Sequence, residues 1–68
     1  MKDIIIAKNK HEDYILYNKT NCRFYLKQYN ERPIKEYSFY NYHEMSEDAM
    51  QSILHAWIMY DRLVEGYK

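Results

Sequence analysis

The fold is decided by the stretch Ser46–Glu65, which reads SEDAMQSILHAWIMYDRLVE. Ser46 is a favourable N-cap, and Glu47 and Asp48 oppose the positive end of a helix dipole. Gly66 follows at a position where helices commonly stop. Apolar side chains recur at spacings of three and four, typical of one helix face. They are Met50, Ile53, Trp57, Tyr60, Val64 and Tyr67. We therefore predict one helix over residues 46–65.

Upstream of this helix lie four short stretches rich in Ile, Tyr and Phe, separated by Asn, Lys and Pro residues that favour turns. They cover residues 3–8, 13–18, 22–29 and 34–42. With 68 residues and 8.5 kDa, the chain is too short for two cores. The sequence predicts a single small domain, 1–68, of the α+β class. Its architecture is a four-stranded antiparallel β-meander with one C-terminal α-helix packed on one face (ββββα).

The turns predict which residues of the strands face the helix, because a slip of one residue turns a strand over. A three-residue loop with Asn21 in the left-handed region pairs Asn18 with Cys22. A loop over residues 9–11 sets the pairing of the first two strands, and a loop over residues 30–33 sets the pairing of the last two. The predicted inward face consists of Ile4, Ile6, Tyr14, Leu16, Phe24, Leu26, Tyr37 and Phe39. On the other face this register produces a row of alternating charges, which is favourable between strands: Ala7, Asp13, Lys27 and Glu36.

The predicted outward face is unusually rich in aromatic and apolar side chains. A sheet covered on one side only is expected to be polar on the other, so such a patch commonly meets a partner. Tyr and Arg are enriched at binding hot spots. The alternative is that Tyr stands there because it favours strands and tolerates half-exposure. We expect a partner-binding site formed by Ile5, Ile15, Tyr17, Arg23, Tyr25 and Tyr40.

A second apolar surface is predicted on the flank of the helix, where Leu54, Ile58 and Leu63 widen the apolar sector beyond one sheet contact. A chain of this length buries a limited share of its surface and is marginally stable alone. These three residues therefore form a candidate dimer surface, with a second copy of the chain as one expected partner.

The charge balance argues against a dedicated nucleic-acid binder. Ten Lys and Arg residues match ten Asp and Glu residues, giving zero formal net charge, whereas such proteins usually carry a basic excess. The alternative stays open that Tyr17, Tyr25 and Tyr40 stack on bases while Arg23 contacts a phosphate. The neighbouring carboxylate of Asp13 counts against it.

No stretch approaches the roughly 18 apolar residues of a membrane span, so no membrane partner is expected.

The residues that usually carry chemistry do not form a catalytic or metal-binding pattern. Cys22 is the one cysteine, so no internal disulfide can form, and a reducing, cytoplasmic location is expected. The single glycine, Gly66, excludes the usual glycine-rich phosphate loops. His11, His43 and His55 lack metal-ligand spacing. We expect no enzyme activity, no metal and no cofactor.

Composition adds a hint about origin. Lysine occurs seven times, asparagine five, isoleucine seven and tyrosine nine, together 28 of 68 residues. All four have A/T-rich codons, which is typical of low-GC bacteria and their phages. We interpret the chain as a non-enzymatic protein-binding module, a small phage- or mobile-element-type inhibitor that contacts a host or defence protein through its aromatic sheet face. The alternative is a small nucleic-acid-binding or regulatory protein that uses the same Tyr and Arg side chains.

Overall fold

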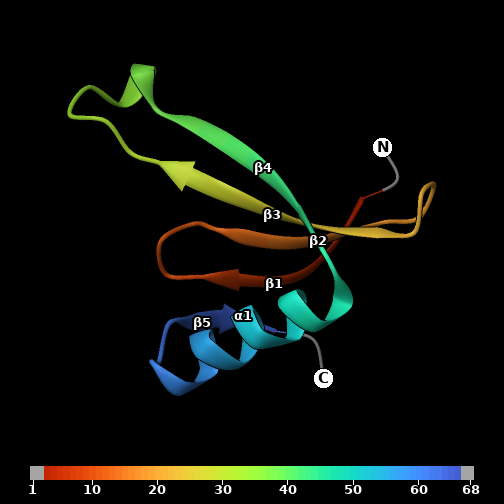
Figure 1. Cartoon of the computed structure of the whole chain (residues 1–68). Helices are drawn as coiled ribbons and strands as arrows, with labels where there is room; N and C mark the ends of the chain where they lie inside the picture. The colour runs from red at the N-terminus through yellow and green to blue at the C-terminus, as the bar shows by residue number, and fades with distance from the viewer. Residues whose placement is uncertain (1–2, 67–68) are drawn as a thin grey trace.

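The computed structural model describes residues 3–66 and shows an antiparallel sheet with one helix packed on it (Figure 1). The α+β class is thereby confirmed, but the sheet has five strands and not the predicted four. The elements are β1 (Asp3–Asn9), β2 (Tyr14–Asn18), β3 (Arg23–Asn30), the 3-10 turn η1 (Lys35–Tyr37), β4 (Phe39–Met45), α1 (Glu47–Met59) and β5 (Leu63–Glu65).

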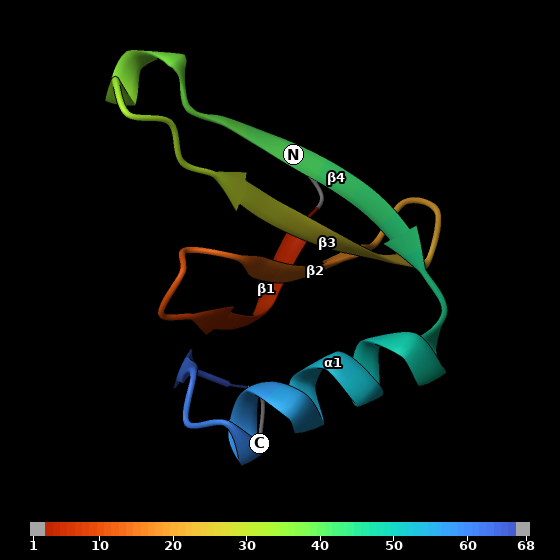
Figure 2. The same ribbon diagram turned by 60° about the vertical axis from the view of Figure 1, so that its left-hand side comes forward.

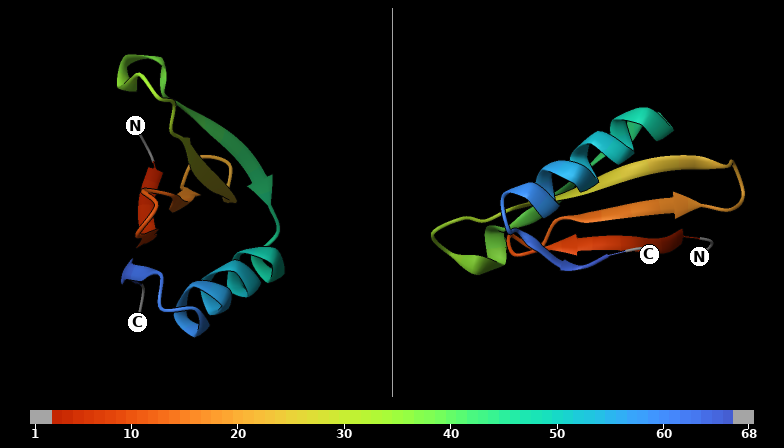
Figure 3. Two further views of the ribbon diagram at one scale, coloured as in Figure 1. Left: turned by 90° about the vertical axis from the view of Figure 1, so that its left-hand side faces the viewer. Right: turned by 90° about the horizontal axis from the view of Figure 1, so that it is seen from below.

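The order of the strands explains how the helix reaches the sheet. Across the sheet the order is β4-β3-β2-β1-β5, and all neighbours are antiparallel. Ser46 alone separates β4 from α1. As Figures 2 and 3 show, α1 starts at the end of β4, runs diagonally across one side of the sheet and leads to β5. The helix therefore covers one face, and β5 extends the edge beyond β1.

The predicted start of the helix is confirmed. The Ser46 hydroxyl accepts a hydrogen bond from the Ala49 backbone N–H at 3.2 Å, as expected of an N-cap. Glu47 and Asp48 lie in the first turn, where their charges interact favourably with the exposed N–H groups. Local sequence therefore determines this end of the helix.

The predicted end of the helix is wrong, because α1 stops at Met59 and residues 63–65 form β5. Asp61 has a φ of 54°, in the left-handed region. The N–H of Arg62 donates to the Trp57 carbonyl at 2.8 Å, and the N–H of Asp61 donates to the Ile58 carbonyl at 3.3 Å. This is the Schellman arrangement, which usually has glycine at the left-handed position. Here an aspartate takes that position, five residues before Gly66.

Replacing Asp61 by glycine is expected to raise the free energy of unfolding by about 0.5–1 kcal/mol, because glycine adopts the left-handed conformation without a steric cost. The change also removes a negative charge from the negative end of the helix dipole. The ion pair between Asp61 and Lys10 spans 3.8 Å with both side chains largely exposed, so its loss costs little. Urea unfolding measures the gain. Asp48→Gly, inside the first turn, should destabilise instead, and equal effects would contradict the assignment.

The core lies between the sheet and α1. Ile15 is 0 % exposed and Trp57 is 8 % exposed, and they form one cluster with Ala7 and Met50. Half-buried side chains surround this cluster: Ile6, Phe24, Leu26, Met45, Ile53, Leu54 and Leu63. The predicted helix stripe is confirmed at Met50, Ile53 and Trp57. Of its remaining members, Tyr60 and Val64 are exposed, and Tyr67 lies outside the described residues.

The turn between β2 and β3 is one residue longer than predicted. Asn18 pairs with Arg23 instead of Cys22, and the residue with a left-handed φ, 59°, is Cys22 instead of Asn21. The Asn18 carbonyl accepts the Cys22 N–H at 2.8 Å, and its side-chain oxygen accepts the N–H groups of Thr20 and Asn21. Because strand faces alternate, this one-residue difference turns β2 over relative to β3.

A bulge in β1 is the second departure from the predicted register. Ile5 pairs with Leu16 and Ala7 pairs with Ile15, so Ile6 is an extra residue on the β1 side. As a result, two consecutive side chains, Ile6 and Ala7, pack against the core. Sequence alternation alone does not reveal such a bulge.

The connection between β3 and β4 is longer than predicted but keeps the faces as expected. Asn30 pairs with Phe39, so the loop spans residues 31–38 and includes η1, whereas the prediction pairs Tyr29 with Ile34. The pairing of β4 is displaced by an even number of residues, which leaves Phe39 and Tyr40 on their predicted faces. Tyr40 therefore shares a face with Tyr25, as predicted. The predicted inward placement of Tyr37 is wrong, because it lies in η1 and is 66 % exposed.

A buried asparagine organises the turn between β1 and β2. Asn9 is 2 % exposed, and its side-chain oxygen accepts the backbone N–H groups of His11 and Asp13, both at 2.9 Å. Its amide nitrogen donates to Asp13 Oδ2 at 3.1 Å. The other carboxylate oxygen of Asp13 accepts the backbone N–H of Tyr29 at 2.8 Å. These bonds tie the turn that precedes β2 to β3.

Candidate functional site

The sheet face that points away from α1, here called the outer face, is lined by alternate residues of the first four strands. Tyr14, Lys27 and Tyr42 are direct neighbours across β2, β3 and β4. The residues between them along the strands, such as Ile15 and Leu26, pack against the core on the opposite side. The outer face comprises Asp3, Ile5, Lys8, Tyr14, Leu16, Asn18, Arg23, Tyr25, Lys27, Tyr29, Tyr40, Tyr42 and Glu44, of which Leu16 is buried.

Lys27 lies at the centre of three tyrosine rings. Its ammonium nitrogen is 4.4 Å from the ring centroid of Tyr40, 5.5 Å from that of Tyr14 and 5.9 Å from that of Tyr42. Lys8 approaches the Tyr14 ring from β1 at 5.6 Å. Each such contact is worth about 0.5–1 kcal/mol at an exposed site. The cations therefore hold the rings in place across β2, β3 and β4.

Tyr40 also packs against a tyrosine of the neighbouring strand. The ring centroids of Tyr29 and Tyr40 are 5.1 Å apart with an interplanar angle of 49°. Burial, followed by the charges of Tyr14, Glu12 and other neighbours, raises the pKa of the Tyr40 hydroxyl above its usual value. The hydroxyl thus stays protonated at neutral pH and can donate a hydrogen bond to a partner.

A second polar group orders the opposite end of the outer face. Arg23 Nη1 lies 3.2 Å from Glu44 Oε2, and the Tyr25 hydroxyl is 3.5 Å from Glu44 Oε1. Asn21 donates from Nδ2 to the Tyr25 hydroxyl at 2.9 Å. The Arg23–Glu44 pair is more than half exposed and adds little stability. Its main effect is to hold Arg23 and Tyr25 side by side.

The structure brings together part of the predicted binding site. Ile5, Arg23, Tyr25 and Tyr40 share the outer face, and Ile5 is 57 % exposed. The placement of Ile15 on that face is wrong, since its side chain is fully buried against α1.

The placement of Tyr17 is also wrong. Its partner across the strands is Phe24, and the two ring centroids lie 5.0 Å apart on the helix side of the sheet. The cause for both residues is the longer β2–β3 turn, which puts Ile15 and Tyr17 on the face opposite to the one predicted.

Several outer-face residues are missing from the predicted binding site, although Lys27 was already placed on this face in the predicted row of charges. Tyr29 and Lys27 alternate with Tyr25 along β3, and Tyr42 alternates with Tyr40 along β4. This two-residue spacing is the signal that could have found them. Tyr14 could not be found in this way, because the predicted register placed it in the core.

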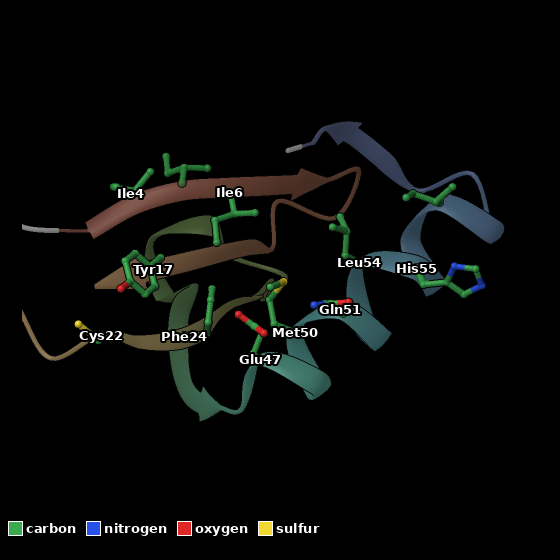
Figure 4. A pocket seen from close by; sticks show the side chains of 12 residues that line it. Ile4, Ile6, Tyr17, Cys22, Phe24, Glu47, Met50, Gln51, Leu54 and His55 are labelled. Atoms are coloured by element: carbon green, nitrogen blue, oxygen red, sulfur yellow. The ribbon is translucent and has the colours of Figure 1, made fainter. Parts of the chain in front are cut away.

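An apolar groove of about 810 Å³ opens on the other side of the sheet, between α1 and the strands β1 to β3 (Figure 4). Tyr17 and Phe24 line it from the sheet, and Met50 and Leu54 line it from the helix. At its rim, a hydrogen bond with Cys22, followed by the electrostatic interaction between the two groups, raises the pKa of the Tyr17 hydroxyl above its usual value.

The predicted dimer surface on the helix flank is only partly continuous. Leu54 and Ile58 both line the groove. Leu63 belongs to β5 and packs against the core, because the helix ends before it. A flank formed by all three residues on one helix is therefore wrong.

Within residues 3–66, no three His, Cys, Asp or Glu side chains come together in a way that could hold a metal ion. In the same range, the helix is too short and too polar to cross a membrane. Comparison with known proteins gave no match, whether against protein-family models, curated proteins or solved structures. Function must therefore be argued from the surfaces of this chain.

Proposed function

We propose that this protein is a non-enzymatic binding module that holds another protein against its outer face. One observation carries the proposal: five tyrosine side chains share one sheet face that α1 leaves uncovered. They are Tyr14, Tyr25, Tyr29, Tyr40 and Tyr42. Tyrosine combines a large contact area with a polar tip and loses little conformational entropy when it is bound, which makes it a common binding anchor.

The order within the outer face supports the same proposal. Lys27 contacts three of the tyrosine rings, and Glu44 holds Arg23 next to Tyr25. Side chains that are ordered before binding lose less freedom when a partner arrives, so more of the contact energy remains as affinity. Ile5, which is 57 % exposed, supplies apolar surface beside the polar tips.

Charge indicates the chemistry of the partner. The outer face carries the cations of Lys8, Lys27 and Arg23 and the carboxylates of Asp3 and Glu44, so cations exceed carboxylates by one. A partner surface that combines carboxylates with apolar side chains would complement this face. The expected partner is therefore an acidic patch on a folded protein.

The biological role that we propose is that of a small inhibitor, encoded by a phage or mobile element, that blocks a host or defence protein by direct contact in the cytoplasm. The A/T-rich codon preference of the composition and the single unpaired cysteine support this role. A module without a catalytic centre can inhibit simply by covering a surface that another molecule needs.

The test compares capture of host proteins by the wild type and by outer-face variants. Arg23→Ala and Tyr25→Ala should each weaken the captured complex at least about tenfold, because truncation of a hot-spot residue costs about 2 kcal/mol or more and about 1.4 kcal/mol is tenfold in affinity. The measurement is pull-down from host lysate, followed by titration of the identified partner.

Tyr60→Ala is the matched control, since Tyr60 is 73 % exposed at the end of α1 and lies outside the outer face. It should bind like the wild type, and circular dichroism should show that all variants stay folded. A partner that binds the Arg23→Ala/Tyr25→Ala double variant with full affinity would remove the outer face as the site.

The competing candidate is nucleic-acid binding by the same face, and salt separates the two. Base stacking needs free ring faces, whereas Lys27 already lies over the rings of Tyr14, Tyr40 and Tyr42. An affinity for single-stranded DNA or RNA that falls steeply with salt would favour the nucleic-acid candidate. Binding to a protein that weakens only slightly with salt, as expected of a few ion pairs around an aromatic contact, would favour the proposal made here.

A further inference from the structure

The edge strand β4 is the most open part of the sheet. It pairs with β3 on one side only, and six of its seven residues are exposed. Figure 2 shows β4 along one margin of the sheet, while α1 and β5 lie toward the opposite margin. The unpaired margin therefore presents a row of backbone N–H and C=O groups that can accept another strand.

β4 lacks the features that normally protect an edge strand. Natural edges are shortened, bulged or supplied with Lys or Pro. The sequence of β4, FYNYHEM, contains neither, and its pairing with β3 is regular over all seven residues. The other edge of the sheet is protected, because β5 has only three residues and β1 carries the bulge at Ile6.

We propose that β4 pairs with β4 of a second copy of the chain, antiparallel, about a two-fold axis at Tyr42. Tyr42 is the middle residue of the strand, so this register pairs all seven residues. Phe39 then faces Met45 of the second copy, an apolar pair with a favourable sulfur–aromatic contact. Asn41 faces His43, and Tyr42 faces its own equivalent.

The register is also complementary in charge. Glu44 of one copy faces Tyr40 of the other, whose ring lies 4.4 Å from the Lys27 ammonium. The carboxylate of one copy therefore comes close to a hydroxyl donor and a cation of the other. The two Glu44 side chains lie four residues apart along the strands, beyond the Debye length at physiological salt. No pair of like charges faces across the axis, and this self-complementarity favours a second copy over an unrelated strand.

Pairing of the two β4 edges would join the two sheets into one, with five strands from each copy. Because pairing leaves each side chain on its own face, the outer faces of both copies would form one surface. This inference does not rest on the proposed binding function. It predicts a dimer of a chain that, at 8.5 kDa, buries a limited share of its surface alone.

The test measures the mass of the 68-residue chain by sedimentation and native mass spectrometry over a wide concentration range. The wild type should reach twice 8.5 kDa. Tyr42→Glu should raise the dissociation constant of the dimer at least about tenfold, because it places two carboxylates directly opposite each other. Within one copy the new carboxylate lies beside Lys27, so the monomer should stay folded.

A charge swap makes the test specific to the register. Tyr42→Lys alone should also dissociate, and circular dichroism checks its fold because the new ammonium lies opposite Lys27. An equimolar mixture of Tyr42→Glu and Tyr42→Lys should form a mixed dimer. Tyr60→Glu, far from β4, is the control and should dimerise like the wild type. Hydrogen exchange should show that the alternate β4 amides that point away from β3 are protected in the dimer and exposed in the Tyr42→Glu monomer.

Three results would overturn the proposal. The first is a wild type that stays monomeric at all concentrations. The second is a dimer that survives Tyr42→Glu, which would locate the contact elsewhere. The third is protection of β4 amides only when a different protein binds, which would assign the edge to a foreign strand.

Discussion

Replacing Trp57 by alanine is expected to lower the free energy of unfolding by about 3–5 kcal/mol. Trp57 is 8 % exposed and packs in the central cluster with Ala7, Ile15 and Met50. A domain of this length has a total stability of roughly 3–10 kcal/mol at about 0.05–0.15 kcal/mol per residue. The variant should therefore be largely unfolded or close to it at room temperature. Thermal and urea unfolding, followed by circular dichroism, measure the loss.

Ile58→Ala is the matched control, because Ile58 is the next residue of α1 and is exposed. It should cost less than about 1 kcal/mol, as is usual for surface positions. A loss for Trp57→Ala as small as that of the control would mean that the helix does not pack on the sheet through this side chain.

Replacing Asn9 by alanine is expected to cost about 2–3 kcal/mol. The change removes two hydrogen bonds from the N–H groups of His11 and Asp13, and leaves Asp13 without its amide donor. Losing one partner of a buried hydrogen bond costs the desolvation of the other, about 1–3 kcal/mol. Urea unfolding measures the effect.

Asn21→Ala is the control for Asn9→Ala. Asn21 lies in the other hairpin turn and also makes side-chain hydrogen bonds, but the groups involved are exposed and water can replace it. It should cost under about 1 kcal/mol. Equal losses for the two variants would show that the burial of Asn9 does not matter to stability.

Local signals predicted the parts of the fold that depend on neighbouring residues. Ser46 caps the helix as expected, and Met50 and Trp57 bury the expected face. The faces of β3 and β4 were correct although the pairing was not, because the displacement was even. Tyr25 and Tyr40 therefore share the outer face as predicted.

The errors trace to backbone conformations that sequence specifies only weakly. Cys22 and Asp61 both adopt left-handed φ values, where Asn21 and Gly66 were the expected turn and stop residues. The left-handed Cys22 lengthens the β2–β3 turn and so turns β2 over relative to β3. The left-handed Asp61 ends the helix early, and residues 63–65 form β5. The row of alternating charges that favoured the wrong register is absent, since Lys27 pairs with two tyrosines. Such agreement between charges cannot by itself establish a register.

The pairing of β5 with β1 has a consequence for biosynthesis. Lys8 meets Glu65, and the α1 residues that bury Ile15 also come late in the chain. The early strands leave the ribosome while the apolar residues of α1 that pack on them are still inside the exit tunnel. Contacts between segments so far apart in the sequence also form slowly. Chaperone contact during translation should therefore concentrate on residues 3–45, and native structure should appear only after synthesis has passed residue 65.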